Sequence, residues 1–341
     1  MNSRWLGLDI GGANLKAWCN GKAISWPFEL WKTPGDLAAK LISLTSEFAG
    51  FSGVSVTMTG ELCDCFASRK EGVSQIVDAV QRAFSEKQIL VYQTGGEFVN
   101  PAIARESWRK TAAANWHAIA SVASQFLPGR TGVLIDIGST TTDVIPFLNG
   151  QVTARGKTDL ARLRHGELLY TGVQRSPVCA VTNRIELAGQ KVSLAQEWFA
   201  SMQDVYIVLE IGAAPDVLET GLDGRPVDFE HSLVRLARLV CSDVKELGRE
   251  AIVDMAKQVA GIHQASIQAS IQNVRNNNPE SAGQILVAGQ GEWLAINMAR
   301  RLVSGGGFVA RLSDCVDAGT SRCAAAWAVS CLAEKRCGAS A

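Results

Sequence analysis

The chain of 341 residues has no excess of charge of either sign, because 33 Lys and Arg balance 33 Asp and Glu. This balance argues against a general surface for nucleic acid or anionic membranes and leaves local basic patches open. The chain also lacks a long apolar run, since the longest, 323–333, is much shorter than a membrane span. No signal peptide is visible before the first apolar segment. We therefore expect a cytoplasmic protein without nucleic-acid or membrane partners.

Cysteine spacing of the kind found in metal or redox sites is also missing. None of the nine cysteines belongs to a Cys-x-x-Cys pair, so reduced thiols are expected. Cys63 and Cys65 have no accompanying histidine cluster, which argues against a zinc site. Hydrophobic residues make up 47% of the chain and charged residues 19%, values that are typical of a compact enzyme.

One motif is present twice. Residues 8–14 (LDIGGAN) and 135–141 (IDIGSTT) both place Asp-Ile-Gly and a turn of small residues after an apolar run. In each copy another apolar run follows and leads to Asn-Gly, at residues 20–21 and 149–150, which is typical of a type I′ hairpin. The sequence therefore predicts two β-meanders in two related half-domains, with a phosphorylated ligand between them.

Three turns are candidates for phosphate contacts. Gly11 and Gly12 let the backbone approach a ligand closely, and the Ser/Thr-rich turn at 138–143 offers amide and hydroxyl donors. The third turn, 289–291, leads from an apolar strand into a helix, as at many phosphate sites. Any one of these turns alone could be purely structural. The predicted ligand-binding residues are Asp9, Gly11, Gly12, Asn14, Lys16, Asp136, Gly138, Ser139, Thr140, Thr141, Asp143, Gly289, Gln290 and Gly291, with Asp9 and Asp136 holding Mg²⁺ through water.

Predicted strands and helices alternate, which indicates an α/β fold. We expect helices near 34–49, 72–85, 112–126, 292–302 and 320–335, and strands at 54–58, 89–92, 205–210 and 285–288. Two helices separated near Gly261 are expected within 230–273. The predicted lobes are 1–130 and 131–341, the second with a mixed or helical insertion at about 157–280.

A segment rich in charged residues, 156–172, follows the second meander and is expected to line the cleft. The predicted catalytic residues in it are Lys157, Asp159, Arg162, Glu167 and Tyr170. His165 belongs to the same segment and is a weaker candidate for a general base. His117 follows Trp116 on a predicted helix, so we expect it to be structural.

The order of two meanders and a Gly-x-Gly turn resembles the actin, sugar-kinase and Hsp70 ATPase superfamily. In that superfamily two ribonuclease-H-like lobes close on a Mg-nucleotide. Residues 59–66, 70–73, 115–118 and 156–172 resemble more specifically one branch of the hydantoinase A/oxoprolinase family. This branch contains the tetrahydromethanopterin-linked C1-transfer pathway proteins, whose archaeal members are furan-methanamine synthases of methanofuran biosynthesis.

The resemblance implies a transferase that condenses a furanylmethyl diphosphate with a tyramine- or tyrosine-type phenol and releases diphosphate. Mg²⁺ would be its cofactor, and Asp159 or Glu167 would take the phenol proton. Two alternatives stay open, an ATP-dependent amide hydrolase of the hydantoinase or oxoprolinase kind and a non-catalytic actin-like scaffold that binds nucleotide. ATP binding and a homo-oligomeric state are likewise left open by the sequence.

Overall fold

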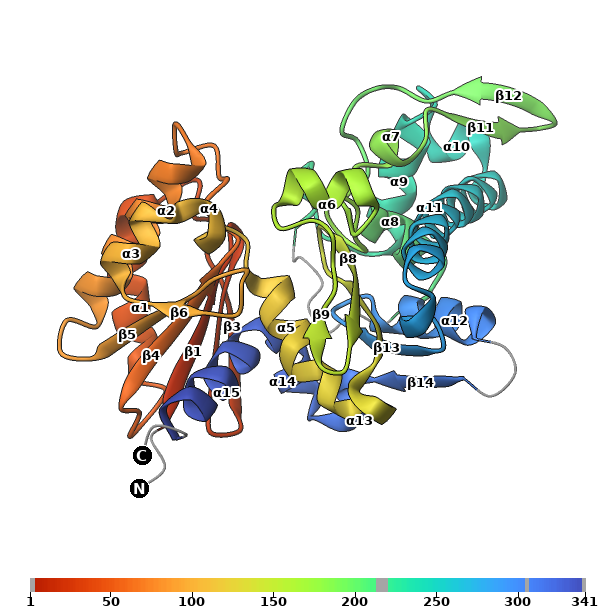
Figure 1. Cartoon of the computed structure of the whole chain (residues 1–341). Helices are drawn as coiled ribbons and strands as arrows, with labels where there is room; N and C mark the ends of the chain where they lie inside the picture. The colour runs from red at the N-terminus through yellow and green to blue at the C-terminus, as the bar shows by residue number, and fades with distance from the viewer. Residues whose placement is uncertain (1–3, 213–219, 304–306, 339–341) are drawn as a thin grey trace.

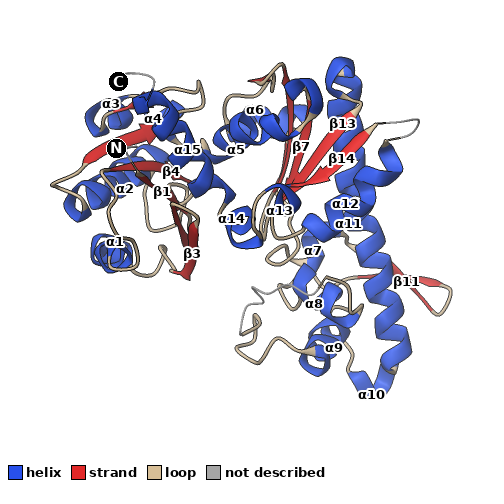
Figure 2. Cartoon of the chain, turned by 90° about the horizontal axis from the view of Figure 1, so that it is seen from below, coloured by secondary structure: helices blue, strands red, loops and turns tan. Residues whose placement is uncertain are grey.

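The computed structural model describes residues 4–212, 220–303 and 307–338. In this part of the chain two six-stranded sheets form the centres of two lobes, which lie side by side (Figure 1). A small two-stranded sheet belongs to the second lobe. Helices cover both sheets, so the predicted α/β class is confirmed (Figure 2).

The first sheet is built around β1, whose six residues are all buried. Its strands are β1 (Trp5–Ile10), β2 (Asn14–Cys19), β3 (Lys22–Pro27), β4 (Gly53–Met58), β5 (Gln88–Tyr92) and β6 (Phe98–Val99), in the order β3-β2-β1-β4-β5-β6. β1, β2 and β3 form an antiparallel meander, and β4 and β5 run parallel to β1. Asn20 and Gly21 both have positive φ, which confirms the type I′ turn.

The second sheet repeats this plan. Its strands are β7 (Gly132–Ile137), β8 (Thr142–Leu148), β9 (Gln151–Val152), β10 (Leu168–Leu169), β13 (Gln284–Ala288) and β14 (Phe308–Arg311). β7 and β8 are antiparallel, β9 pairs with β8, and β13 and β14 run parallel to β7. Asn149 and Gly150 again have positive φ. Two lobes of this plan are what the resemblance to the actin-like superfamily implies.

Helices pack on both faces of the first sheet. The helices of this lobe are η1 (Pro34–Asp36), α1 (Leu37–Thr45), α2 (Arg69–Ala83), α3 (Pro101–Glu106), α4 (Trp108–Thr111), α5 (Asn115–Ala123), η2 (Ser124–Phe126) and η3 (Pro128–Arg130). Leu6, Leu8 and Ile10 alternate along β1 and share a core with α1 and α2, whereas Trp5 belongs to a core with α5 on the opposite face.

The insertion in the second lobe is mainly helical. It contains α6 (Asp159–His165), α7 (Val178–Val181), β11 (Arg184–Leu187), β12 (Gln190–Ser193), α8 (Met202–Val208), α9 (Phe229–Arg238), α10 (Val244–Leu247), α11 (Arg249–Asn277) and η4 (Pro279–Ser281). The chain then continues through α12 (Glu292–Leu302), α13 (Leu312–Cys315), α14 (Ala318–Arg322) and α15 (Ala324–Gly338). None of the described helices is long and apolar enough to span a bilayer.

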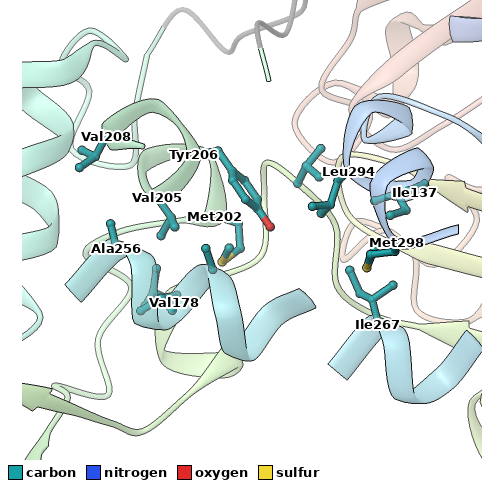
Figure 3. Packing of buried hydrophobic residues seen from close by; sticks show 14 of the residues in the cluster. Ile137, Val178, Met202, Val205, Tyr206, Val208, Ala256, Ile267, Leu294 and Met298 are labelled. Carbon is teal, nitrogen blue, oxygen red and sulfur yellow. The ribbon is translucent and has the colours of Figure 1, made fainter. Parts of the chain in front are cut away.

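The predicted strand at 205–210 is wrong, because most of this segment belongs to helix α8. Ser201 and Asp204 form a capping box that starts the helix, and the amide N of Ser201 donates to Asp204 Oδ2 at 2.9 Å. Val205, Tyr206 and Val208 are all buried in the core of the second lobe (Figure 3). A short apolar run buried on several sides has no helical periodicity to distinguish it from a strand.

The predicted break near Gly261 is also wrong. Helix α11 runs through this position, and the chain turns instead at 239–243 and at Gly248. A glycine within a helix costs only about 1 kcal/mol relative to alanine. The long buried face of α11, which includes Ile252, Val259 and Ile267, outweighs that cost.

Helix α15 returns from the end of the chain to the first sheet (Figure 1). Ser330 Oγ donates to the carbonyl of Trp5 at 2.6 Å, and the helix crosses β1 at Gly7. The division into lobes at residue 130 stays a prediction. The described residues of α15 lie on the first sheet, although they belong to the predicted second lobe.

The close approach of α15 makes Gly7→Ala destabilising. A Cβ at Gly7 would lie 1.9 Å from the Ala326 carbonyl oxygen, so the helix would have to move. We expect a loss of about 1–3 kcal/mol in the free energy of unfolding, measured in urea. The same change at exposed Gly261, where a Cβ meets nothing within 4 Å, should add about 0.5–1 kcal/mol. Equal effects at the two sites would contradict this packing.

Candidate active site

A cleft of about 700 Å³ is lined by residues of both lobes, and all three predicted turns contribute to it. Thirteen of the fourteen predicted ligand-binding residues line the cleft: Asp9, Gly11, Gly12, Asn14, Lys16, Asp136, Gly138, Ser139, Thr140, Thr141, Asp143, Gly289 and Gln290. Gly291 does not. Its amide donates to the carbonyl of Ile137 at 2.7 Å, and a Cβ there would meet the Ile137 side chain. Gly291 therefore serves packing between α12 and β7.

The first two turns have the same backbone closure. The amide of Gly11 donates to the Asn14 carbonyl at 3.0 Å, and the amide of Gly138 donates to the Thr141 carbonyl at 2.8 Å. The third turn lies against the second, since a Cβ on Gly289 would be 2.2 Å from Asp136 Oδ1. Gly289 also has a φ of 88°, so both space and conformation require glycine.

Asp9 and Asp136 stand near the ends of β1 and β7, the equivalent strands of the two sheets. Asp9 Oδ1 is buried without a hydrogen-bond partner. Burial raises the pKa of Asp9, and nearby Lys16 partly opposes this effect. The pKa of Asp136 is raised to about 7, chiefly by burial and also by the charges of Asp143 and Asp9, while Lys16 acts in the opposite direction. Both carboxylates would gain from a bound cation.

The two carboxylates fit a hydrated Mg²⁺ better than a directly chelated metal. Within the described ranges no group of three or more His, Cys, Asp or Glu is arranged to hold a metal ion. Mg²⁺ often keeps several of its waters and binds one or two carboxylates together with substrate phosphates. Asp9, with its unpartnered oxygen, and Asp136 match that requirement.

Two of the predicted catalytic residues, Arg162 and Asp159, line the cleft on helix α6. Arg162 is buried, bonds Asp143 and stacks over the Trp116 ring at 4.2 Å from its centroid. Asp159 lies in the first turn of α6, which Thr158 caps by accepting the amide proton of Ala161. One turn of α6 thus presents Asp159 and Arg162 to the same wall of the cleft.

Glu167 lies outside the cleft that its segment is predicted to line. Its two carboxylate oxygens accept the amide protons of Arg155, at 2.6 Å, and Gly156, at 2.8 Å. It does not line the cleft but holds the chain that leads into α6. A carboxylate committed to two backbone amides does not fit the predicted role of general base.

Two further residues of the same segment lie outside the cleft. Lys157 is exposed and does not line it. His165 is exposed too, and contributes to a separate polar cavity of about 140 Å³ with Arg155 and Arg164. Lys157 precedes the helix cap, and His165 is the last residue of α6. The direction of a side chain at either end of a helix depends on where that helix begins and ends, which the sequence did not predict here.

Tyr170 lines the cleft, as predicted, and is 66% exposed. Leu62 of the first lobe and Trp198 of the second, both more than half exposed, line the same cleft. Nearby, the Arg175 guanidinium lies 5.2 Å from the centroid of Trp31, a contact between the two lobes. The cleft therefore combines aromatic surface with the predicted phosphate turns.

An ion-pair bridge between the lobes was missed by sequence reasoning. Arg69 of α2 bonds Glu61 at 2.8 Å and Asp159 of the other lobe at 3.1 Å. Glu61 follows the carboxyl end of β4, which runs parallel to β1. The carboxyl ends of parallel strands meet at one edge of a sheet, where ligands commonly bind. The position of Glu61 just after a predicted strand could therefore have marked it as a candidate site residue. Arg69 lies eight residues further on and gave no such signal.

His117 is structural, as expected. Its ring is buried, and Nδ1 lies 2.8 Å from the hydroxyl oxygen of Tyr92. Burial lowers its pKa to about 4, with a smaller contribution from the charge of Lys157. His117 is therefore a neutral, buried side chain that packs within the first lobe against Tyr92 and Trp116.

The raised pKa of Asp136 makes metal-free stability depend on pH. Because the folded-state pKa is about 7 and the ordinary value is 3.8, the fold prefers the protonated form. This contribution to stability is present below about pH 4 and is lost as the pH rises through 7. In thermal unfolding with EDTA, Asp136→Asn should match the wild type near pH 4 and be the more stable protein at pH 8.

Mg²⁺ should reverse that order by stabilising the wild type at pH 8 and not Asp136→Asn. Asp254→Asn, which removes a carboxylate that is 66% exposed, should leave the pH dependence and the Mg²⁺ effect unchanged. If the difference in thermal stability between Asp136→Asn and the wild type does not vary with pH, the raised pKa of Asp136 is contradicted.

A solved structure with the same fold is a nucleotide-free acetone carboxylase. It superposes with a TM-score of 0.59 over 96% of this chain and 70% of that one, at 11% sequence identity. At this identity the similarity concerns the fold alone.

Sequence relatives identify the family. The hydantoinase/oxoprolinase family model matches residues 52–312. A (4-{4-[2-(γ-L-glutamylamino)ethyl]phenoxymethyl}furan-2-yl)methanamine synthase of Methanocaldococcus jannaschii is 35% identical over 258 residues, 74% of this chain and 76% of the relative. A synthase of the same name from Methanococcus vannielii is 32% identical over 161 residues, 47% of this chain and 71% of that protein. This chain belongs to the hydantoinase/oxoprolinase family.

Proposed function

We propose that the chain is a biosynthetic transferase that joins a furanylmethyl diphosphate to a tyramine- or tyrosine-type phenol and releases diphosphate. The product named for both relatives contains a phenoxymethyl-furan unit, an ether between a phenol oxygen and a furanylmethyl carbon. The observation that carries the proposal is a single cleft in which three small-residue turns and two acidic strand ends adjoin exposed aromatic side chains.

The diphosphate group fits the turns around Gly11, Gly138 and Gly289. Small residues there leave room for phosphate oxygens close to the backbone. The positively charged side chains of Lys16 and Arg175 line the same cleft and partly balance the charge of its carboxylates. Asp9 and Asp136 would hold Mg²⁺ through water, and the bound ion would supply positive charge to the departing diphosphate.

The phenol fits the aromatic part of the cleft. Tyr170 and Trp198 offer exposed ring surface on which an aromatic acceptor can pack. When the methylene carbon loses diphosphate, an electron-rich furan stabilises the positive charge that develops there. The chain therefore has to position the phenol oxygen, take its proton and stabilise the leaving group. Of the two predicted bases, only Asp159 lines the cleft.

A paired-substrate assay tests this function. The purified protein with Mg²⁺ is given either a furanylmethyl diphosphate and a phenolic amine, or ATP and a lactam. We expect ether formation and an equal amount of diphosphate from the first pair only. ATP turnover that depends on the lactam would establish the amide-hydrolase alternative instead. Nucleotide binding without turnover of either pair would favour a scaffold.

Asp136→Asn should reduce ether formation by at least about 100-fold, because the leaving group loses the cation that this carboxylate helps to hold. The rate is measured as diphosphate release at saturating phenol. Glu167→Gln should change the rate only through stability, so its activity at low temperature should stay near that of the wild type. A large, temperature-independent loss for Glu167→Gln would show that Glu167 takes part in the chemistry.

A further inference from the structure

We propose that Glu61, rather than Asp159, accepts the phenol proton during ether formation. This inference rests on the proposed transferase function and assigns a residue to its proton-transfer step. Glu61 lines the cleft from the first lobe, opposite the charged segment in which sequence reasoning sought the base.

The backbone holds Glu61 beside the first small-residue turn. The amides of Thr59 and Gly60 both donate to the carbonyl of Ile10, at 2.9 and 3.0 Å, directly next to Gly11. A Cβ on Gly60 would lie 3.1 Å from the Gly11 carbonyl carbon. On the other side, a Cβ on Gly72 of α2 would lie 2.2 Å from the Glu61 carbonyl oxygen. The residue is fixed between the predicted diphosphate site and helix α2.

The two oxygens of the Glu61 carboxylate differ in their hydrogen bonding. Its side chain is only 2% exposed, and Oε1 accepts from Arg69 at 2.8 Å. Oε2 is buried and has no hydrogen-bond partner. A buried polar atom without a partner is costly, which is expected where a ligand supplies the missing donor. A phenol hydroxyl is a donor of this kind.

Asp159 is less suited to the same task. Its Oδ2 lies 3.1 Å from Arg69, and its Oδ1 lies 3.7 Å from Arg162, so each oxygen faces a guanidinium group. Arg69 thus joins the two carboxylates, and of these two only Glu61 has a buried oxygen without a hydrogen-bond partner. In this arrangement Asp159 is a positioning residue that orients Arg69 against Glu61.

The groups that face Glu61 come from several elements. They are Arg69 of α2, Asp159 of α6, and Cys63 and Tyr170 at the cleft wall. Burial raises the pKa of Glu61, Arg69 opposes this effect, and the charge of Asp159 adds to it. A carboxylate with a raised pKa is a stronger base when ionised.

The proposed step balances in atoms and electrons. The phenol O–H bond breaks, and its proton moves to Glu61 Oε2. The phenol oxygen forms a bond to the furanylmethyl carbon, while the bond from that carbon to the diphosphate oxygen breaks. The electron pair of this bond leaves with diphosphate. Glu61 then returns the proton to solvent after product release.

Phenols of different acidity test this assignment. Glu61→Gln keeps a hydrogen-bond acceptor for Arg69 but cannot take a proton at neutral pH. With tyramine we expect it to lower kcat by about 10²–10⁴-fold. With ring-fluorinated tyramines that are ionised at the assay pH, its kcat should return to within about tenfold of the wild type, since no base is needed. Asp159→Asn should slow all phenols by the same factor.

With a base in place, we expect the kcat of the wild type to depend only weakly on the acidity of the phenol. Glu61→Asp keeps a carboxylate, so its kcat should be lower but should show the same weak dependence. This variant decides the matter if Glu61→Gln does not fold. Equal losses for all phenols in Glu61→Gln, or rescue by acidic phenols in Asp159→Asn, would overturn the assignment to Glu61. Failure of the wild type to condense any pair would instead overturn the proposed function, and this inference with it.

Discussion

The burial of two carboxylates, at the ends of β1 and β7, is the constraint on which the rest of the cleft depends. Asp9 faces Lys16 across its hairpin, whereas the equivalent neighbour of Asp136 is Asp143, another acid. Arg162 compensates Asp143, which leaves Asp9 and Asp136 without an equivalent ion pair among the described residues. Burial raises the pKa of both carboxylates, and no ion pair in the described ranges offsets this effect. Two buried carboxylates without such a pair favour a bound cation, and the Mg²⁺ proposed to accompany diphosphate would supply it.

Ion pairs also join the two halves of the site. Glu61, Arg69 and Asp159 link the first lobe to α6, and Arg162 continues the series to Asp143 in β8. Burying charged groups costs desolvation free energy, so these ion pairs contribute little to stability. Their main effect here is to fix the geometry of the site. They fix α6 against α2 and bring side chains from both lobes to one wall of the cleft. The orientation of the proposed base and the contact between α2 and α6 therefore depend on the same arginine, Arg69.

Sequence was sufficient where the signal is local. The two meanders, their Asn-Gly turns and the glycines at 11, 138 and 289 follow from strand ends and turn chemistry, and all lie where the sequence predicts. Longer-range relations were not accessible. Glu167 is committed to two backbone amides, Arg69 reaches across to Asp159, and α15 returns to Gly7, each through tertiary packing. Helix α8 was mistaken for a strand because its residues are buried on several sides, which removes the periodicity used to distinguish the two.

We propose that this two-lobed cleft makes a carbon–oxygen bond and does not transfer phosphate. A phenolic acceptor labelled with ¹⁸O at its hydroxyl tests it most directly, with products analysed by mass spectrometry. We expect the label to appear in the ether and the released diphosphate to carry none. Label in a phosphorylated phenol, or in any phosphate product, would contradict it, because the bond broken would then be between phosphorus and oxygen.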